Sequence, residues 1–186
     1  MKSKLFVIAG PSGVGKGTII KDLLSQNDNL TLSVSSTTRH PRPGEIDGVN
    51  YNFLNLEQFK TSIADGEFLE WAIYNNNYYG TKKSAVNDAL NNDKSIILEI
   101  EIQGALQIME KCPEAVFIFI LPPSYEELEN RLRGRNTEDE QTIQNRLKIT
   151  QKELEIGKKF KYRVVNNTVQ NAVKEILNII NKECEC

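Results

Sequence analysis

Cysteine is scarce in this chain of 186 residues, and the three that occur are scattered, at Cys112, Cys184 and Cys186. Thiols so few and so spaced exclude a disulfide framework and indicate a reducing compartment. Long apolar runs are absent as well. The first run, Leu5–Ala9, is too short for a secretory signal and far too short to cross a bilayer. The composition therefore predicts a cytoplasmic protein without a membrane partner.

A strong charge of one sign is also lacking. Lysine and arginine number 23 against 25 aspartates and glutamates, so the formal net charge is −2. This balance does not favour nucleic acid or anionic lipid, and neither is an expected partner. The sequence has no internal repeat and no low-complexity linker. With 39% hydrophobic and 26% charged residues, it fits one ordinary globular domain.

The end of the sequence, Cys184-Glu185-Cys186, resembles the doubly prenylated tail of small membrane GTPases. The Asn-Lys-x-Asp motif with which those proteins read their base is missing, because the nearest match, Asn181-Lys182-Glu183-Cys184, ends in the wrong residue. We therefore expect a solvated tail whose two thiols have no role.

A glycine-rich run directly follows the first apolar stretch. It reads Gly10-Pro11-Ser12-Gly13-Val14-Gly15-Lys16-Gly17-Thr18, and a helical pattern comes next. A strand, a glycine loop and a helix in this order direct backbone N–H groups and the positive end of a helix dipole at one anion. Lys16 adds a mobile charge for the β- and γ-phosphates of a nucleotide. The run predicts a polyphosphate site.

One position departs from the G-x-x-x-x-G-K-[ST] pattern of such loops. Gly17 stands where a hydroxyl usually reaches Mg²⁺, and Thr18 follows one place later. Metal binding is therefore expected through Thr18 or through water.

Short apolar runs rich in β-branched residues alternate with helical patterns along most of the chain. The runs are Leu5–Ala9, Leu30–Val34, Ile96–Ile100, Val116–Leu121 and Tyr162–Val165. Helices are expected after Lys16 and over residues 103–111, 124–133, 140–157 and 169–182. This alternation predicts an α/β fold whose parallel sheet is covered by helices on both faces.

The segment from Thr37 to Leu90 has a different texture. Prolines and glycines fill its first part, residues 51–54 and 68–74 alternate as half-buried strands, and residues 55–64 form a helical pattern between them. The segment predicts a small mixed lobe mounted on the sheet. A second excursion, residues 131–156, is polar and rich in charge, and it predicts a lid.

Arginine is the rarer basic residue, with seven arginines against sixteen lysines. Six of the seven fall in two zones: Arg39 and Arg42, and then Arg131, Arg133, Arg135 and Arg146. A chain that otherwise prefers lysine uses arginine where a planar fork must bind phosphate oxygens. Phosphate contacts are expected at Arg39, Arg42, Arg135 and Arg146. Arg133 is expected to pair instead with Glu129, four residues earlier on the same helix.

Two carboxylates, Glu99 and Glu101, close the apolar run that begins at Ile96. Their spacing puts both on one face at the carboxyl end of a strand, which is where open α/β sheets bind ligands. Beside a phosphate loop they are candidates for holding a base edge or metal-associated water. Glu99 is therefore the second candidate metal ligand.

Longer motifs occur in a fixed order. After the Gly10–Lys16 loop come Ser33-Val34-Ser35-Ser36-Thr37-Thr38-Arg39-x-Pro41-Arg42-x-Gly44-Glu45, Asp47-Gly48-x-x-Tyr51-x-Phe53, Phe68-x-Glu70-Trp71-Ala72, Tyr78-Tyr79-Gly80-Thr81 and Glu99-x-Glu101-x-Gln103-Gly104. Arg131-Leu132-x-x-Arg135 and Val164-Val165-Asn166 follow them. In content and order these motifs resemble those of guanylate kinases, and the resemblance covers essentially the whole chain.

The resemblance implies an enzyme that transfers the γ-phosphoryl group of ATP to GMP, giving ADP and GDP, with Mg²⁺ accompanying ATP. It implies a three-layer P-loop core (residues 1–36, 91–125 and 157–186), a GMP-binding lobe (residues 37–90) and a helical lid (residues 126–156). The expected partners are ATP and GMP, and the expected assembly is a monomer or a homodimer.

Site residues follow from the same resemblance. The phosphate of GMP would be held by Arg39, Arg42, Tyr51 and Tyr79, and guanine would be read by Ser35, Glu70, Thr81 and Glu101. ATP would lie on the loop from Gly10 to Thr18, with Arg135 and Asn166. The catalytic residues would be Lys16, Arg39, Arg42, Arg135 and Arg146. Thr81 stands where serine is common, and Glu101 where aspartate is common.

Two other readings stay open. A guanylate-kinase-like scaffold would bind peptides without turnover, but the intact loop with Lys16 argues against it. A sister kinase would phosphorylate another acceptor, such as a ribose phosphate. Ser35, Glu70 and Thr81 make guanine the better candidate. A carboxylate such as that of Glu70 can accept both the N1–H and N2–H₂ donors of guanine, and adenine offers no such pair.

Overall fold

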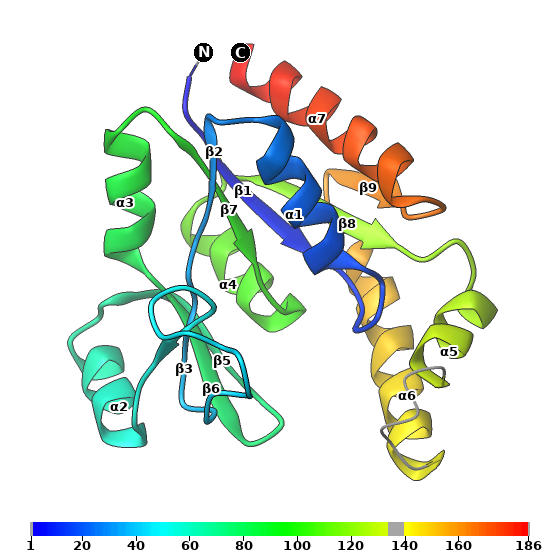
Figure 1. Ribbon diagram of the computed structural model, residues 1–186, viewed down its shortest axis with the longest axis horizontal. Helices are drawn as coiled ribbons and strands as arrows, with labels where there is room; N and C mark the ends of the chain where they lie inside the picture. Colours follow the sequence, from blue (N-terminus) through cyan, green and yellow to red (C-terminus); the bar gives the residue numbers. More distant parts are fainter. Residues whose placement is uncertain (1, 134–139, 186) are drawn as a thin grey trace.

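Strands and helices alternate through most of residues 2–133 and 140–185, which the computed structural model describes (Figure 1). The core elements are β1 (Leu5–Ala9), α1 (Lys16–Gln26), β2 (Leu30–Leu32), α3 (Lys83–Asn91), β7 (Ser95–Glu99), α4 (Ile102–Lys111), β8 (Val116–Leu121), β9 (Tyr162–Val165) and α7 (Val169–Glu185). The segment between β8 and β9 contains α5 (Tyr125–Arg133) and α6 (Glu140–Gly157). The lobe elements are β3 (Ser36–Thr37), β4 (Asn52–Phe53), α2 (Leu56–Ala64), β5 (Phe68–Tyr74) and β6 (Asn77–Lys82).

The main sheet has the order β2-β7-β1-β8-β9, and every pair of neighbouring strands in it is parallel. Alternation along β1 sends Phe6 and Ile8 into one apolar cluster, which they share with residues of α1 and α7. Leu5, Val7 and Ala9 enter a second cluster with residues of α3 and α4. Helices thus cover both faces of a parallel sheet, as predicted.

The small lobe is a second sheet, of order β4-β3-β6-β5, with α2 packed on it. Asn55 caps α2: its side chain accepts from the Gln58 backbone N–H at 2.8 Å, while the Gln58 side chain accepts from the Asn55 N–H at 2.9 Å. β5 and β6 form a hairpin whose two-residue turn, Asn75 and Asn76, has positive φ of 48° and 61°.

Three elements between β2 and β7 were not predicted: β3, β6 and α3. β3 is only two residues long. β6 begins at an asparagine and carries polar residues among its aromatics, so its strand pattern is weak. α3 has only one buried apolar residue, Val86, while Ala89 and Leu90 are partly buried against the same apolar cluster. It nevertheless packs on the core strand β7, because Val86 belongs to the apolar cluster of that face.

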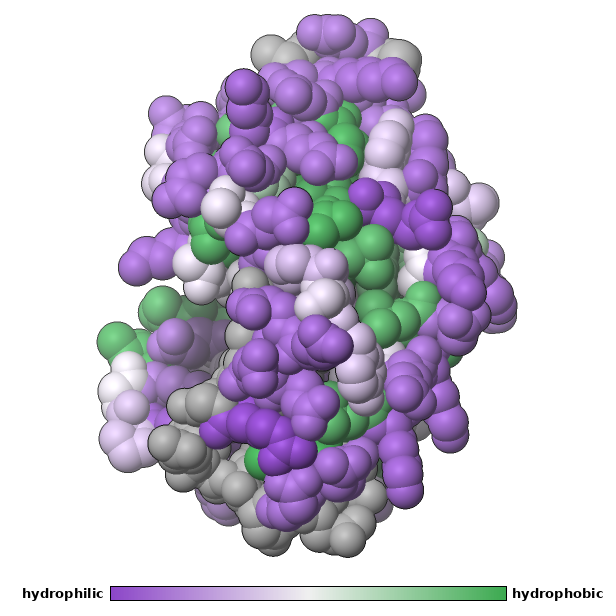
Figure 2. All heavy atoms as spheres, turned by 90° about the vertical axis from the view of Figure 1, so that its right-hand side faces the viewer, coloured by the Kyte–Doolittle hydropathy of each residue, from purple (hydrophilic) through white to green (hydrophobic). Residues whose placement is uncertain are grey.

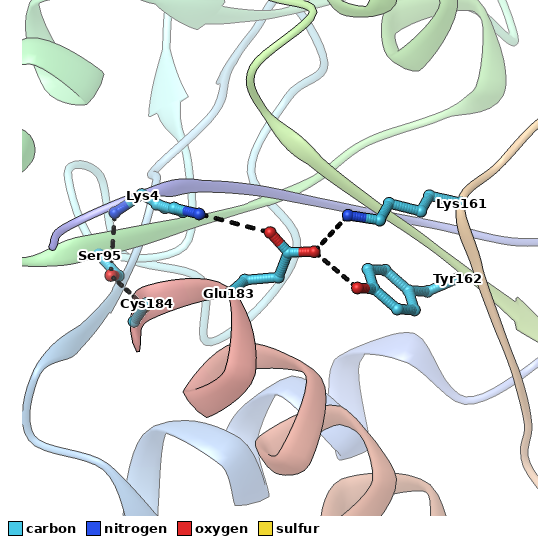
Figure 3. A network of polar contacts seen from close by, with 6 residues as sticks. All are labelled: Lys4, Ser95, Lys161, Tyr162, Glu183 and Cys184. Carbon is cyan, nitrogen blue, oxygen red and sulfur yellow. Dashed lines mark hydrogen bonds and ion pairs between the residues drawn. The ribbon is translucent and has the colours of Figure 1, made fainter. Parts of the chain in front are cut away.

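The prediction for the C-terminal cysteines was wrong for Cys184. α7 continues to Glu185, and Cys184 is 7% exposed. The apolar stripe through Ile176 and Ile180 reaches Cys184 four residues later, which places the thiol on the buried face of the helix. Its sulfur lies 3.6 Å from Ser95 Oγ (Figure 3). Cys186 lies outside the described residues.

Glu183, which precedes Cys184 on α7, connects the end of this helix to the sheet through its side chain. Its carboxylate accepts from Lys4 Nζ at 3.4 Å and from Tyr162 Oη at 2.6 Å, and it pairs with Lys161 (Figure 3). The hydrogen bonds from Lys161 and Tyr162 lower the pKa of this carboxyl to about 2. The two ends of the described chain meet here, since the Lys2 N–H donates to the Cys184 carbonyl at 3.0 Å.

The face of the molecule formed by α5, α6, β9 and α7 is mainly hydrophilic, with apolar side chains confined to a band between polar ones (Figure 2). Among the helices described, none combines the length and the apolar character that a membrane span needs. The carboxyl ends of the core strands lie at the opposite edge from the chain ends, between the small lobe and the α5–α6 segment (Figure 1).

Candidate active site

The glycine loop joins β1 to α1 at this edge. α1 begins at Lys16. The residue before it, Gly15, has a φ of 95°, a left-handed backbone conformation that favours glycine. The first turn of α1 contains no acidic side chain, and Gly15 has no side chain to cap the helix. The first N–H groups of α1 thus keep their capacity to bind an anion, together with the positive end of the helix dipole.

Lys16 and Asn166 hold the loop in shape. Lys16 Nζ donates to the Gly10 carbonyl at 2.6 Å and to the Pro11 carbonyl at 3.3 Å. The buried amide of Asn166, just past β9, donates to the Val14 carbonyl at 2.8 Å. The resemblance implied that Asn166 contacts ATP, and the structure shows its amide bound to the loop itself.

A cavity of about 290 Å³ opens beside the loop, between the core and the lobe. Its walls bring together nine of the predicted residues: Lys16, Ser35, Arg39, Arg42, Tyr51, Glu70, Tyr79, Glu99 and Glu101. They come from the loop, the lobe and the end of β7, so distant segments of sequence meet in one pocket. Thr81 lies behind the wall, completely buried.

Arginines of the lobe make one end of the cavity positive. Arg39 Nη2 donates to Glu45 Oε1 at 2.8 Å, and its guanidinium carbon lies 5.3 Å from the ring centre of Tyr51. Hydrogen bonding to Arg39 lowers the pKa of Glu45. Arg42 is exposed at the rim, and its backbone N–H donates to Glu45 Oε2 at 2.7 Å. Glu45 therefore positions the two arginines relative to each other.

Glu70 supplies a carboxylate in the interior. It lies on β5, is 4% exposed and accepts from Thr81 Oγ1 at 2.7 Å. Burial raises the pKa of Glu70, and the hydrogen bond from Thr81 opposes that shift. A carboxylate held in this way has acceptor capacity left for a ligand with adjacent N–H donors. Thr81 acts on the cavity through Glu70.

Three carboxylates interact in this region: Glu99 and Glu153 each interact with the charge of Lys16, and Glu101 interacts with both of these carboxylates. Glu99 ends β7, and burial raises its pKa while the charge of Lys16 opposes the shift. Glu101 precedes α4 as its N-terminal flanking residue. Glu153 on α6, which sequence analysis missed, has its pKa raised to about 7 by burial and by the charge of Glu101. No local signal marks Glu153, since only the packing of α6 brings it here.

The structure also brings residues to the cavity wall that were not assigned a role. The polar ones among them are Ser33, Asn50 and Tyr74. Ser33 lies in the same motif as Ser35, and its buried hydroxyl has no hydrogen-bond partner among the described residues. Alternation along the chain from Ser33 to Ser35 could have indicated that both serines face this region.

The lid residues are described only in part. Arg133 pairs with Glu129 at 2.7 Å and also with Glu140, which confirms its predicted ion pair. Arg135 lies outside the described residues. Arg131 and Arg146 lie on α5 and α6, and their side chains are not among those described.

Comparisons with known proteins agree with this geometry. A sequence model described as guanylate kinase matches residues 2–183. A guanylate kinase of Clostridioides difficile is 52% identical over 98% of this chain and 89% of its own length. A guanylate kinase of Prochlorococcus marinus is 51% identical over 95% of this chain and 96% of its own length. The crystal structure of a guanylate kinase from Anaplasma phagocytophilum superimposes with a TM-score of 0.80 at 34% identity, covering 98% of this chain and 86% of that one. The chain belongs to the guanylate kinase family.

Proposed function

We propose that this protein transfers the γ-phosphoryl group of ATP to GMP, giving ADP and GDP. One observation carries the proposal: a single cavity is lined by the loop lysine, by two arginines of the lobe and by a buried carboxylate. Such a cavity suits a nucleoside monophosphate whose phosphate faces the loop. The relatives named guanylate kinase support the choice of GMP.

The donor would bind at the glycine loop. The free N–H groups at the start of α1 would bind the phosphates of ATP, and Lys16 would exchange its carbonyl contacts for phosphate oxygens. The lid arginines Arg135 and Arg146 would close over the same phosphates, as the family pattern implies. An arginine that meets the transferring group in the transition state can contribute about 10³–10⁵ in rate.

The acceptor would bind with its phosphate toward Arg39 and Arg42 and its base toward Glu70. Tyr51 and Tyr79 would add phenol donors to the phosphate, since both line the cavity beside Arg39. Glu70 would accept the paired N–H donors of guanine, and with adenine it would stay buried and unpaired. No general base is needed, because a phosphate with a second pKa of about 6 is already ionised near neutral pH.

The residues near the loop fit Mg²⁺ delivered with ATP. Mg²⁺ prefers oxygen ligands, keeps several waters and needs one or two protein groups besides the phosphates. Thr18 is exposed in the first turn of α1, and a Cβ built on Gly17 would lie 3.9 Å from Glu99 Oε1, so that carboxylate faces the same turn. Within the described part of the chain, no cluster of three carboxylate, histidine or cysteine side chains could hold an ion alone. When bound, the ion would neutralise charge between the β- and γ-phosphates.

The test is ADP formation from ATP and Mg²⁺ with GMP, AMP, CMP, UMP or no acceptor. We expect turnover with GMP and little with the others. Lys16→Met should abolish it, because the loop loses its phosphate-binding charge, whereas Lys21→Met, an exposed lysine of the same helix, should not. Absence of turnover with every acceptor would indicate a scaffold, and turnover without preference for GMP would indicate a sister kinase.

A further inference from the structure

One face of α4 holds the strand that carries Glu70. Gln107 Nε2 donates to the Trp71 carbonyl at 2.6 Å, and Gln107 Oε1 accepts from the Trp71 N–H at 3.3 Å. Lys111 Nζ donates to the Leu69 carbonyl at 2.7 Å. The backbone on both sides of Glu70 is therefore bound by side chains of a core helix.

Gly104 belongs to the same face, because it precedes Gln107 by three residues and Lys111 by seven. It is buried, and the Glu70 side chain lies directly against it. A Cβ at Gly104 would lie 2.9 Å from the carboxyl carbon of Glu70 and nearer still to Oε2. Cβ atoms essentially never approach another heavy atom within 3.0 Å. Any side chain at this position would displace the carboxylate.

The first turn of α4 also suits a carboxylate electrostatically. The first N–H groups of a helix lack partners within it, and its N-terminal end carries positive partial charge. α4 has no acidic residue in its first turn that would use this capacity. The carboxylate of Glu70 thus lies between the Thr81 hydroxyl, bound to Oε1, and the bare Cα of Gly104, next to Oε2.

We infer that Gly104 is a specificity-determining position: its missing side chain sets where the Glu70 carboxylate stands, and so determines whether GMP is recognised. The inference rests on the proposed function, in which Glu70 reads guanine. Gly104 is a positioning residue and acts through Glu70.

Glycine has a lower helix propensity than alanine, so replacing Gly104 by alanine does not by itself destabilise the helix. The clash is with the end of a side chain and not with backbone. Gly104→Ala should therefore fold, with the carboxylate moved by roughly 1 Å. A misplacement of that size can cost about 100-fold in activity.

We expect Gly104→Ala to lower kcat/KM for GMP by about 100-fold, mainly through the KM for GMP, with the KM for ATP within about twofold of the parent. Discrimination between GMP and AMP should fall as well. Glu110→Ala, an exposed residue of the same helix, is the matched control and should change none of these values.

A double-mutant cycle with Glu70→Asp links the effect to the carboxylate. Glu70→Asp alone should lower GMP use, because the carboxylate no longer reaches the base. In the Gly104→Ala background it should add little, since the carboxylate is already displaced. If Gly104→Ala lowers the thermal midpoint, the double variant should restore it, because the shorter side chain removes the clash.

Two results would overturn the inference: full additivity of the two losses, or an unchanged KM for GMP in Gly104→Ala. The proposed function would still stand in either case, provided that Glu70→Asp alone raises the KM for GMP. An unchanged KM for GMP in Glu70→Asp itself would instead show that Glu70 does not read guanine, and the proposed acceptor site would fail together with the inference.

Discussion

At the scale of single residues, Glu70 combines a cost to the fold with its proposed role. Burial raises the pKa of its carboxyl, so the folded protein binds a proton more readily than the unfolded chain does. The sign follows from proton linkage: the free energy of unfolding falls as pH rises from the unfolded pKa through the raised folded one. An ionised Glu70 is therefore a charge that the fold would accommodate more easily in its neutral form.

We predict that Glu70→Gln raises the thermal midpoint of the nucleotide-free protein at pH 8, and raises it by much less at about pH 4, which lies below the unfolded pKa of 4.5. The same variant should lose GMP turnover, because an amide cannot accept both guanine donors. Thermal unfolding at the two pH values, with exposed Glu110→Gln as control, measures this. An equal shift at both pH values would contradict it.

At the scale of elements, α6 crosses from the lid to the sheet. Its last residue, Gly157, lets the helix lie directly against Phe119 of the strand β8. A Cβ on Gly157 would lie within 2.8 Å of three atoms of the Phe119 ring on β8. Phe119 is completely buried, and it packs against Phe160 with ring centres 5.1 Å apart. The helix can end at this point only because residue 157 is glycine.

Gly157→Ala should lower the free energy of unfolding by about 1–3 kcal/mol, since the extra methyl must be forced into a packed interior. Lys159→Ala, two residues later and exposed, should change it by less than about 0.5 kcal/mol. Urea unfolding of both variants is the measurement. A stability equal to that of the parent would mean that Phe119 has room to turn aside.

At the scale of the whole molecule, Glu183 joins both ends of the described chain to the edge of the sheet. Its side chain is 12% exposed and binds groups that precede β1 and begin β9 (Figure 3). Because its pKa is lowered to about 2, its contribution to stability is present above the unfolded value near 4.5 and is lost as pH falls toward 2. This contact closes the fold far from the cavity.

Glu183→Gln is expected to lower the free energy of unfolding by about 2 kcal/mol at pH 7, allowing for solvent screening, and by much less at about pH 2.5. Glu185→Gln, exposed at the same helix end, serves as control. Denaturant unfolding at both pH values measures the difference. GMP turnover below the melting range should be unchanged, and a loss of turnover there would show that this edge communicates with the site.

Local pattern alone determined the glycine loop, the alternation of strands and helices and the division into a sheet and a small lobe. These features depend on residues close in sequence: the Gly10–Lys16 run, the unbroken apolar run Leu5–Ala9 and the capping residue Asn55 each act on their own neighbours. Motif order then indicated the family and most of the cavity wall.

Tertiary packing decided the rest. Only the docking of α4 on β5 brings Gly104 against Glu70, only the path of α6 brings Glu153 toward Lys16, and only the packing of α7 buries Cys184. In each case the partners are far apart in sequence, so neither partner's local pattern records the contact. Steric exclusion and burial act between elements, and they exist only once the chain has folded.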